Sequence, residues 1–235
     1  MSYLLLDRFR SLFEGVRYRH RDSSLGDSVA WCLPEDLYGL HRSEKFNLGV
    51  DAKHRILNVQ NKLRGIQARR GDGTFGELIP HAVAVSIPGF VIARGPVATV
   101  EIGTEVKILA NSMIKQIDRV MNDLQNQARE FKTAGGNPIT VGIVGINQAD
   151  HYVSYEGDVE WRTGIKGKKH PFQEAADAER RLLAKAAPVF DEFVVLRYRA
   201  WNEPPHLFEW VNEGGTAADY GAALVRIIRK YDVRF

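Results

Sequence analysis

The 235-residue sequence has very little cysteine and no long uncharged stretch. Its single cysteine, Cys32, excludes an internal disulfide and is typical of a reducing compartment. The longest uncharged run covers residues 78–93, and its 16 residues fall short of the roughly 20 that a membrane-spanning helix needs. The apolar block near Met1 is too short for a secretory signal. These absences predict a soluble, cytoplasmic protein with no membrane partner.

Motifs of two other enzyme classes are missing as well. The sequence has no GxSxG for serine hydrolysis, and its seven histidines show none of the spacings that bind zinc. Residues 71–76 match GxGxxG, but a dinucleotide fingerprint lies between a strand and a helix. Here a basic, helix-like segment comes before the glycines and strand-prone residues follow them. We therefore interpret residues 71–76 as a turn.

The charge is unevenly distributed along the chain. Overall the net charge is +3, yet residues 1–70 hold 13 Lys and Arg against 8 Asp and Glu. Between residues 52 and 70 there are six basic side chains and no acid, namely Lys53, Arg55, Lys62, Arg64, Arg69 and Arg70. This asymmetry is typical of a surface that faces nucleic-acid phosphates. The alternative is an ordinary solvated helix face.

Hydrophobic spacing predicts an alternation of helices and strands. The expected helices cover residues 3–16, 50–68, 111–132, 171–187 and about 216–230. The expected strands cover residues 81–87, 90–93, 98–109, 139–146 and 190–200, with a turn at residues 94–96 and an irregular segment over 17–49. This order predicts an α/β or α+β fold with a central mixed sheet flanked by helices. We expect residues 1–49 to pack on a core formed by residues 50–235.

One acid–x–Lys triplet stands out by its context. Of the three triplets in the chain, only Glu105-Val106-Lys107 lies in an expected strand whose other face is apolar. Both charged side chains then share one face of that strand. A carboxylate there can hold Mg²⁺, and a neighbouring ammonium can position water and stabilise a phosphate under attack. The alternative is a solvated strand face of alternating charge.

The order of elements around this triplet resembles the core of the PD-(D/E)xK nuclease superfamily, the restriction-endonuclease-like fold. The resemblance covers residues 50–146. It implies that Glu105 is a ligand of Mg²⁺ or Mn²⁺ and that Lys107 is the catalytic lysine. The family also uses an earlier acid on the neighbouring strand, often after proline, whereas residues 78–100 contain no Asp or Glu.

Two acids are candidates for that missing ligand. Glu77 comes just before the expected sheet, and some members of the superfamily add a glutamate from such a position. Glu101 shares the strand face of Glu105 but lies about 13 Å along the strand, unless a bulge near Gly103 shortens the gap. Lys115 and Gln116 begin the following helix, where the resemblance places residues that approach the scissile phosphate. The alternative for both is an exposed helix face.

The resulting hypothesis is a Mg²⁺-dependent endonuclease that hydrolyses DNA phosphodiesters in restriction, repair or defence. The basic segment would follow the DNA backbone, and a homodimer would suit a cut in both strands. The first alternative is a non-catalytic nucleic-acid-binding or regulatory protein on the same scaffold. The second is a protein–protein module that uses residues 1–49 and the C-terminal helix.

Overall fold

The chain folds around one seven-stranded mixed sheet. The computed structural model describes residues 2–20, 22, 24–58, 72–133, 136–156, 159–164 and 169–235. The order across the sheet is β3 (Arg94–Gly95), β1 (Arg55–Asn58), β2 (Gly73–Leu78), β4 (Val97–Leu109), β5 (Ile139–Asn147), β8 (Glu192–Ala200) and β9 (Phe208–Trp210). Strand β4 is antiparallel to β2 and parallel to β5. The predicted α/β class with a central mixed sheet is confirmed.

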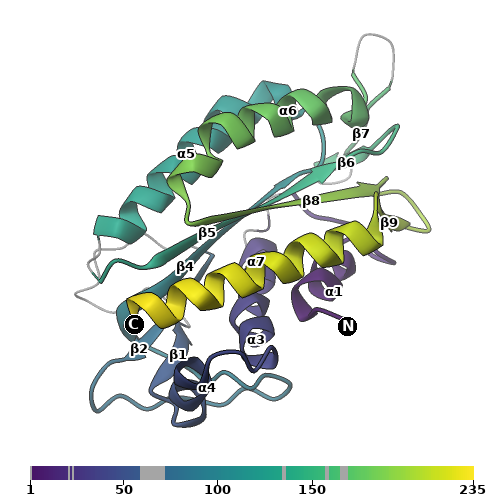
Figure 1. Cartoon of the computed structure of the whole chain (residues 1–235). Helices are drawn as coiled ribbons and strands as arrows, with labels where there is room; N and C mark the ends of the chain where they lie inside the picture. The colour runs from purple at the N-terminus through teal and green to yellow at the C-terminus, as the bar shows by residue number, and fades with distance from the viewer. Residues whose placement is uncertain are drawn as a thin grey trace.

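Helices cover both faces of the sheet (Figure 1). On one face lie α5 (Met113–Thr133) and α6 (Pro171–Lys185), whose apolar sides share a buried cluster with β5. The other face packs against α7 (Glu213–Arg234) and four shorter helices in a second cluster. These are α1 (Leu4–Ser11), α2 (Ser24–Ala30), α3 (Cys32–Gly39) and α4 (Glu44–Asp51). The sheet is therefore covered on both sides, which suits the continuous apolar run of β5.

Strand β4 lies directly against α5 because one of its residues is a glycine. A Cβ added at Gly103 would lie 2.6 Å from the ring of Phe131, closer than real Cβ contacts come. The helix can therefore approach the strand just before Glu105 and Lys107. Helix α5 and strand β5 confirm the predictions for residues 111–132 and 139–146.

Two predictions about the N-terminal half are wrong. The segment 17–49, expected to be irregular, contains α2, α3 and α4. The helix expected over 50–68 is wrong for the described residues 52–58, because α4 ends at Asp51, Lys53 adopts a positive φ of 55°, and β1 follows. Ile56 and Leu57 are both fully buried, as neighbouring residues of an interior strand are. Residues 59–71 lie outside the described part, and the division at residue 49 stays a prediction, although α4 runs across it.

The strands expected over residues 81–87 and 90–93 do not form. Among the described residues, Val85 is the one position of these two stretches that forms a backbone bridge, to Arg94, and the expected turn at 94–96 contains the short strand β3. Side chains of Val83, Val85 and Val91 are more than half exposed. These three valines therefore lie on a surface loop, whereas Ile92 of the same stretch is buried in the core.

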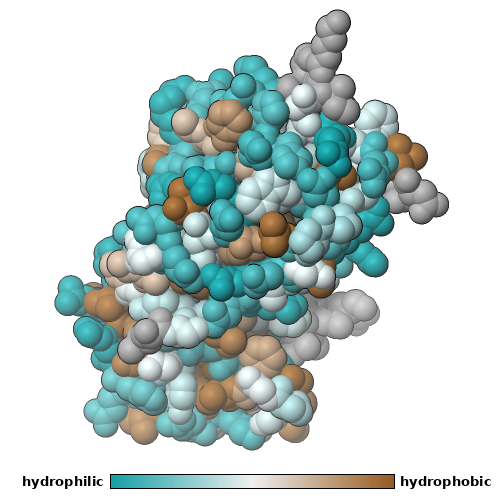
Figure 2. Space-filling model, turned by 90° about the vertical axis from the view of Figure 1, so that its right-hand side faces the viewer, coloured by the Kyte–Doolittle hydropathy of each residue, from teal (hydrophilic) through white to brown (hydrophobic). Residues whose placement is uncertain are grey.

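A separate two-stranded sheet, β6 (Val153–Glu156) with β7 (Val159–Arg162), projects beside the end of the main sheet (Figure 1). The face shown in Figure 2 is mostly hydrophilic, with hydrophobic residues in small groups among polar ones. Among the described residues, none of the helices combines the length and apolar character that crossing a bilayer requires.

Candidate active site

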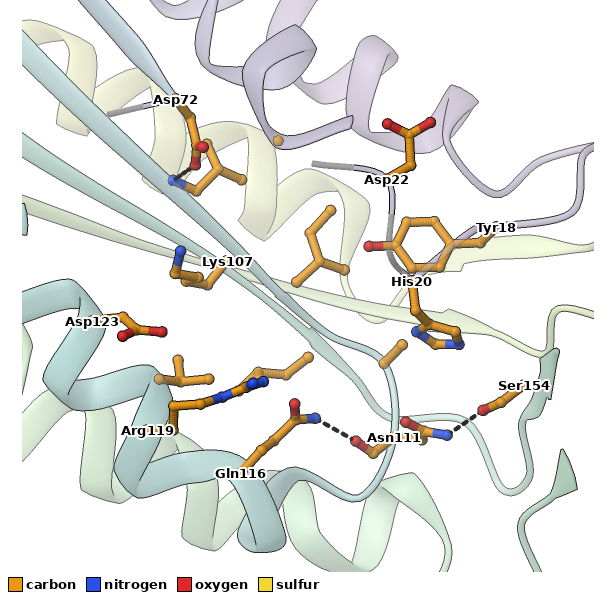
Figure 3. A pocket seen from close by; sticks show the side chains of 16 residues that line it. Tyr18, His20, Asp22, Asp72, Lys107, Asn111, Gln116, Arg119, Asp123 and Ser154 are labelled. Carbon is orange, nitrogen blue, oxygen red and sulfur yellow. Dashed lines mark hydrogen bonds between the residues drawn. The ribbon is translucent and has the colours of Figure 1, made fainter. Parts of the chain in front are cut away.

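A cavity of about 640 Å³ opens beside the second half of β4 (Figure 3). One wall is the N-terminal segment with Tyr18, His20 and Asp22. The opposite wall is the first half of α5, where Gln116, Arg119 and Asp123 recur at helical spacing and share one face. Lys107 projects from β4 between these walls, and Asp72 lies at the same end of the cavity. Most of the side chains that meet there are polar or charged.

Asp72 reaches the site because it immediately precedes β2. The register of β2 and β4 pairs Gly73 with Thr104, so the next residue back lies beside Glu105. The carboxylate of Asp72 accepts a hydrogen bond of 2.7 Å from the backbone N–H of Val106. The Asp72 side chain thus takes the hydrogen bond from β4 that a further residue of β2 would have taken, just beyond the point where the pairing of the two strands ends. The antiparallel pair brings together two carboxylates from opposite ends of a 34-residue stretch of sequence.

Glu105 and Lys107 project from the same face of β4, as their spacing predicted. The Nζ of Lys107 lies 2.5 Å from Oε1 of Glu105, and the side chain of Glu105 is only 6% exposed. The other carboxylate oxygen, Oε2, is buried without a hydrogen-bond partner within the described part of the chain. The solvated, charge-alternating alternative is therefore wrong for Glu105. A buried anionic oxygen without a partner is costly, and a bound cation would offset that cost.

The pKa values of Glu105 and Lys107 depend on each other and on the charge of Asp72. Burial, followed by the negative charge of Asp72, raises the pKa of Glu105 to about 7, while Lys107 opposes the shift. Burial lowers the pKa of Lys107, but the charges of Glu105 and Asp72 and the hydrogen bond to Glu105 outweigh it, so that the pKa of Lys107 is raised. Lys107 is therefore an ammonium at neutral pH. The pocket carries an excess of carboxylate over ammonium, which favours a divalent cation.

The donor set fits Mg²⁺. No set of three or more His, Cys, Asp or Glu side chains suited to a metal occurs in the described residues, so Asp72 and Glu105 would be the protein's two carboxylates. Mg²⁺ commonly binds one or two carboxylates and keeps several waters or substrate phosphate oxygens. Asp72 and Lys107 line the open cavity, and the buried Glu105 pairs with Lys107, so the cavity leaves room for those further ligands. The residues present therefore suit the magnesium or manganese ion that the sequence resemblance implies.

Glu101 is not brought to this site. A bulge in β4 lies at Glu101, because Phe75 pairs with Ile102 while Gly76 pairs with Val100. The bulge turns the Glu101 carboxylate to the α7 side, where it accepts a 2.7 Å hydrogen bond from Tyr231 and lies 2.7 Å from Nε of Arg55. The bulge expected near Gly103 thus takes Glu101 away from Glu105 rather than towards it. Its side chain is 4% exposed, so the solvated alternative is wrong here too.

Glu77 also lies apart from the candidate metal ligands. It belongs to β2, where it pairs in register with Thr99, and its side chain is 52% exposed. Its Oε1 lies 3.8 Å from Nη1 of Arg55. Glu77 of β2 and Glu101 of β4 thus both contact Arg55 of β1. This Arg55 cluster lies beside the part of β4 that precedes Gly103. The structure provides Asp72 where the sequence analysis expected one of these glutamates.

The basic residues of 52–70 do not form a helical stripe in the described part. Arg55 lies in β1 and is engaged by Glu101 and Glu77, which raise the pKa of Arg55 against the opposing effect of burial. Lys53 donates to Ser86. Lys62, Arg64, Arg69 and Arg70 lie outside the described residues. On α5, Gln116 lines the cavity, whereas Lys115 is exposed and does not.

Several cavity residues were missed by the sequence analysis. Asp72 was read only as part of a glycine-rich turn, although recognising residues 73–78 as a strand would have placed it beside Glu105. The signal for Arg119 and Asp123 is their helical spacing from Gln116. Tyr18 and His20 carried no signal, because the segment before α2 has no periodicity.

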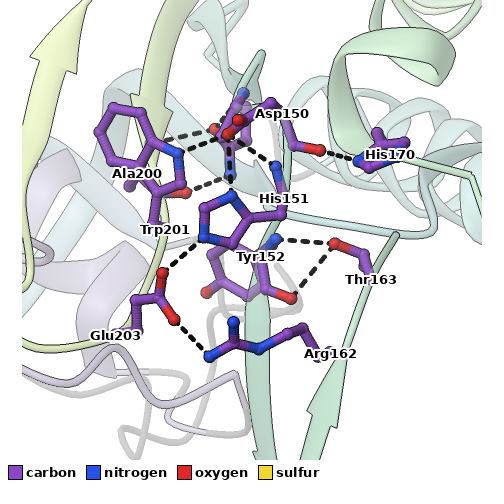
Figure 4. Close-up of polar contacts among 11 residues, drawn as sticks. Asp150, His151, Tyr152, Arg162, Thr163, His170, Ala200, Trp201 and Glu203 are labelled. Atoms are coloured by element: carbon purple, nitrogen blue, oxygen red, sulfur yellow. Dashed lines mark hydrogen bonds and ion pairs between the residues drawn. The ribbon is translucent and has the colours of Figure 1, made fainter. Parts of the chain in front are cut away.

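A second polar cluster braces the β6–β7 hairpin (Figure 4). The ring of His151 lies between two carboxylates, with Nδ1 2.9 Å from Asp150 and Nε2 2.5 Å from Glu203. Glu203 also pairs with Arg162 of β7 at 2.5 Å, and Trp201 donates to Asp150 at 2.7 Å. Because the carboxylates meet opposite sides of the ring, they do not converge on one point. These contacts tie the hairpin to the loops that follow β5 and β8.

Comparisons of the chain with protein-family models, curated proteins and solved structures give no match.

Proposed function

We propose that this chain is a Mg²⁺-dependent endonuclease that hydrolyses DNA phosphodiester bonds. The observation that carries the proposal is the placement of Asp72 and Lys107 at one end of a polar cavity, with the buried Glu105 2.5 Å from Lys107 and Asp72 hydrogen-bonded to the backbone of Val106 between them. The acid just before β2, Glu-x-Lys on the antiparallel β4, and then α5 and the parallel β5 match the later part of the order on which the PD-(D/E)xK resemblance rests, whereas the strands expected over 81–87 and 90–93 are absent from it. Gly71, not proline, precedes Asp72, so the residue type at that position differs.

The residues have distinct roles in this proposal. Asp72 and Glu105 would hold the metal ion through their carboxylates, and the unpartnered Oε2 of Glu105 is the observation that suits this role. When bound, Mg²⁺ supplies Lewis acidity towards a phosphoryl oxygen and lowers the pKa of water. Lys107, held as an ammonium by Glu105, orients the attacking water and stabilises negative charge on the phosphoryl group. Arg119, exposed on the opposite wall, adds positive charge for the substrate backbone.

A plasmid assay tests the proposal. Purified protein is incubated with supercoiled DNA and Mg²⁺, and cleavage is compared among the wild type, Asp72→Asn, Glu105→Gln and Glu77→Gln. The proposal expects the first two variants to lose cleavage and Glu77→Gln to keep it. Cleavage by all four proteins would place the active site elsewhere. Size-exclusion chromatography with light scattering tests the homodimer.

The second candidate is a nucleic-acid-binding protein without catalysis. Sequence features favour it, namely the basic segment and the lack of proline before the acid. It expects DNA binding that weakens with salt, because Lys and Arg displace counterions from phosphates, together with no cleavage in Mg²⁺ or Mn²⁺.

A further inference from the structure

The end of the cavity away from Lys107 has a different character. Figure 3 shows His20 there, opposite Asn111 and Ser154. His20 is an exposed residue whose ring is partly covered by neighbouring rings, and neither ring nitrogen hydrogen-bonds to a described residue. Among the described residues that line the cavity, Asp22 is the carboxylate nearest to His20 in the sequence, and it accepts hydrogen bonds from the backbone N–H and the hydroxyl of Ser24. An aromatic ring and neutral polar groups therefore face the cavity here.

Within the described part of the chain, two aromatic rings pack against His20 and orient it. Its ring meets Tyr18 edge-on at a centroid distance of 5.3 Å and Tyr152 at 5.4 Å. Both tyrosines are held in place by their surroundings. The backbone N–H of Tyr18 donates to Asn202 at 2.7 Å, and Tyr152 is fully buried. Burial of part of the ring lowers the pKa of His20, so that the ring is neutral at neutral pH. A neutral imidazole offers one donor and one acceptor without using either to hold itself in place.

Two side-chain amides complete this end of the cavity. The Nδ2 of Asn111 donates to Ser154 at 2.5 Å, and the Nε2 of Gln116 donates to the backbone oxygen of Asn111 at 2.9 Å. These bonds use amide N–H groups and fix both side chains. Their carbonyl oxygens accept no hydrogen bond from the described residues and are available to a ligand. A ring for stacking beside fixed donors and acceptors is what recognises the edge of an unpaired nucleobase.

The size of the cavity suits a single unpaired nucleotide. At about 640 Å³ it falls within the roughly 300–1,000 Å³ typical of pockets for single small ligands. A nucleotide fits such a space, whereas a base pair held in a duplex would have to leave its stack to enter it.

We propose that this end of the cavity is a nucleobase subsite, in which His20 and the amides of Asn111 and Gln116 bind one unpaired base of a strand whose scissile phosphate lies at the Lys107 end. The inference rests on the proposed function for the position of that phosphate. It identifies the substrate as an unpaired or extruded nucleotide and His20 as a specificity-determining residue. Stacking on an aromatic side chain contributes about 1–3 kcal/mol per base, which corresponds to roughly tenfold or more in affinity.

Binding measurements without metal test the subsite apart from catalysis. In EDTA, fluorescence anisotropy gives the affinity for short single-stranded oligodeoxynucleotides that are complete or carry one central abasic site. The wild type is expected to bind the complete strand about tenfold more tightly. His20→Ala is expected to lose that preference, and His20→Phe, which keeps a ring, to retain most of it. His54→Ala, an exposed histidine outside the cavity, is the matched control and should behave as the wild type.

Two outcomes would overturn the subsite. One is a preference for the complete strand that survives in His20→Ala. The other is an equal loss of affinity by His20→Ala for a fully paired duplex, since His20 would then act on the backbone. The proposed function fails separately, when Glu105→Gln and Asp72→Asn still cleave. Those two variants should keep the preference for the complete strand, because neither residue lies at the His20 end.

Discussion

The carboxylate of Asp72 accepts a 2.7 Å hydrogen bond from the backbone N–H of Val106, the residue between Glu105 and Lys107. This contact fastens the residue before β2 to the middle of the Glu-x-Lys triplet on β4. It also explains the unusual state of Glu105, whose pKa rises through burial and then through the nearby charge of Asp72. The hydrogen bond and the pKa shift therefore involve the same group of residues, Asp72, Glu105 and Lys107.

Lys107 should be required for cleavage but not for metal binding. Replacing Lys107 by Met keeps the length of the side chain and removes its charge. Because one preorganised charged donor contributes about 10²–10³ in rate, kcat for plasmid cleavage is expected to fall by that factor. Lys115→Met is the matched control on α5, since Lys115 is exposed away from the cavity. Equal losses in both variants would remove Lys107 from the mechanism.

Glu105 should make the metal-free protein less stable as the pH rises. Its folded-state pKa of about 7 lies above its ordinary value of 4.5, so the folded state favours the protonated form. The wild type should therefore lose stability relative to Glu105→Gln between about pH 4.5 and pH 7, by up to about 3 kcal/mol. Urea unfolding of both proteins across that range measures the difference. Mg²⁺ should reduce it, because binding to the carboxylate stabilises the folded wild type. Parallel pH profiles would show that Glu105 is not buried as described.

The Glu101 cluster should support the fold without affecting the metal site. Tyr231→Phe removes the hydrogen bond to Glu101 and leaves a buried carboxylate with one partner fewer. We expect the free energy of unfolding to fall by about 1–3 kcal/mol. Mn²⁺ affinity at the Asp72 end should not change, because Glu101 lies on the other side of β4. A coupled loss of Mn²⁺ binding in a folded variant would contradict this division.

Asp191 should contribute to resistance against acid. Burial raises its pKa, but hydrogen bonds from Arg234 and Thr140 outweigh that effect and lower the pKa of Asp191 to about 2. A lowered folded-state pKa stabilises the protein above the ordinary value of 3.8, and the contribution disappears as the pH falls towards 2. Asp191→Asn should therefore cost about 2 kcal/mol near neutral pH and little near pH 2. Circular dichroism during urea unfolding at several pH values tests the difference between the proteins.

The long amphipathic and the uniformly apolar segments were predictable from sequence. Helix α5 and strand β5 follow the expected ranges because one has a clear helical stripe and the other is buried on both faces. The pairing of Glu105 with Lys107 followed from the two-residue period of a strand. These features depend only on neighbours along the chain.

The mispredicted features depend on the pairing of strands that lie far apart in the sequence. The bulge at Glu101 depends on how β2 and β4 pair, and it reversed the face on which that glutamate lies. Asp72 gained its place from the same pairing, since nothing within residues 71–76 reveals the neighbouring strand. The valines around position 85 favoured a strand by type, yet they lie at the edge of the sheet where only one bridge forms.

Mn²⁺ binding measured by isothermal titration calorimetry tests the central claim most directly. The wild type and Glu77→Gln should bind Mn²⁺ with similar affinity, while Asp72→Asn and Glu105→Gln should each bind at least tenfold more weakly. Unchanged affinity in Asp72→Asn, with Glu77→Gln impaired, would contradict the account and move the metal to the Arg55 cluster.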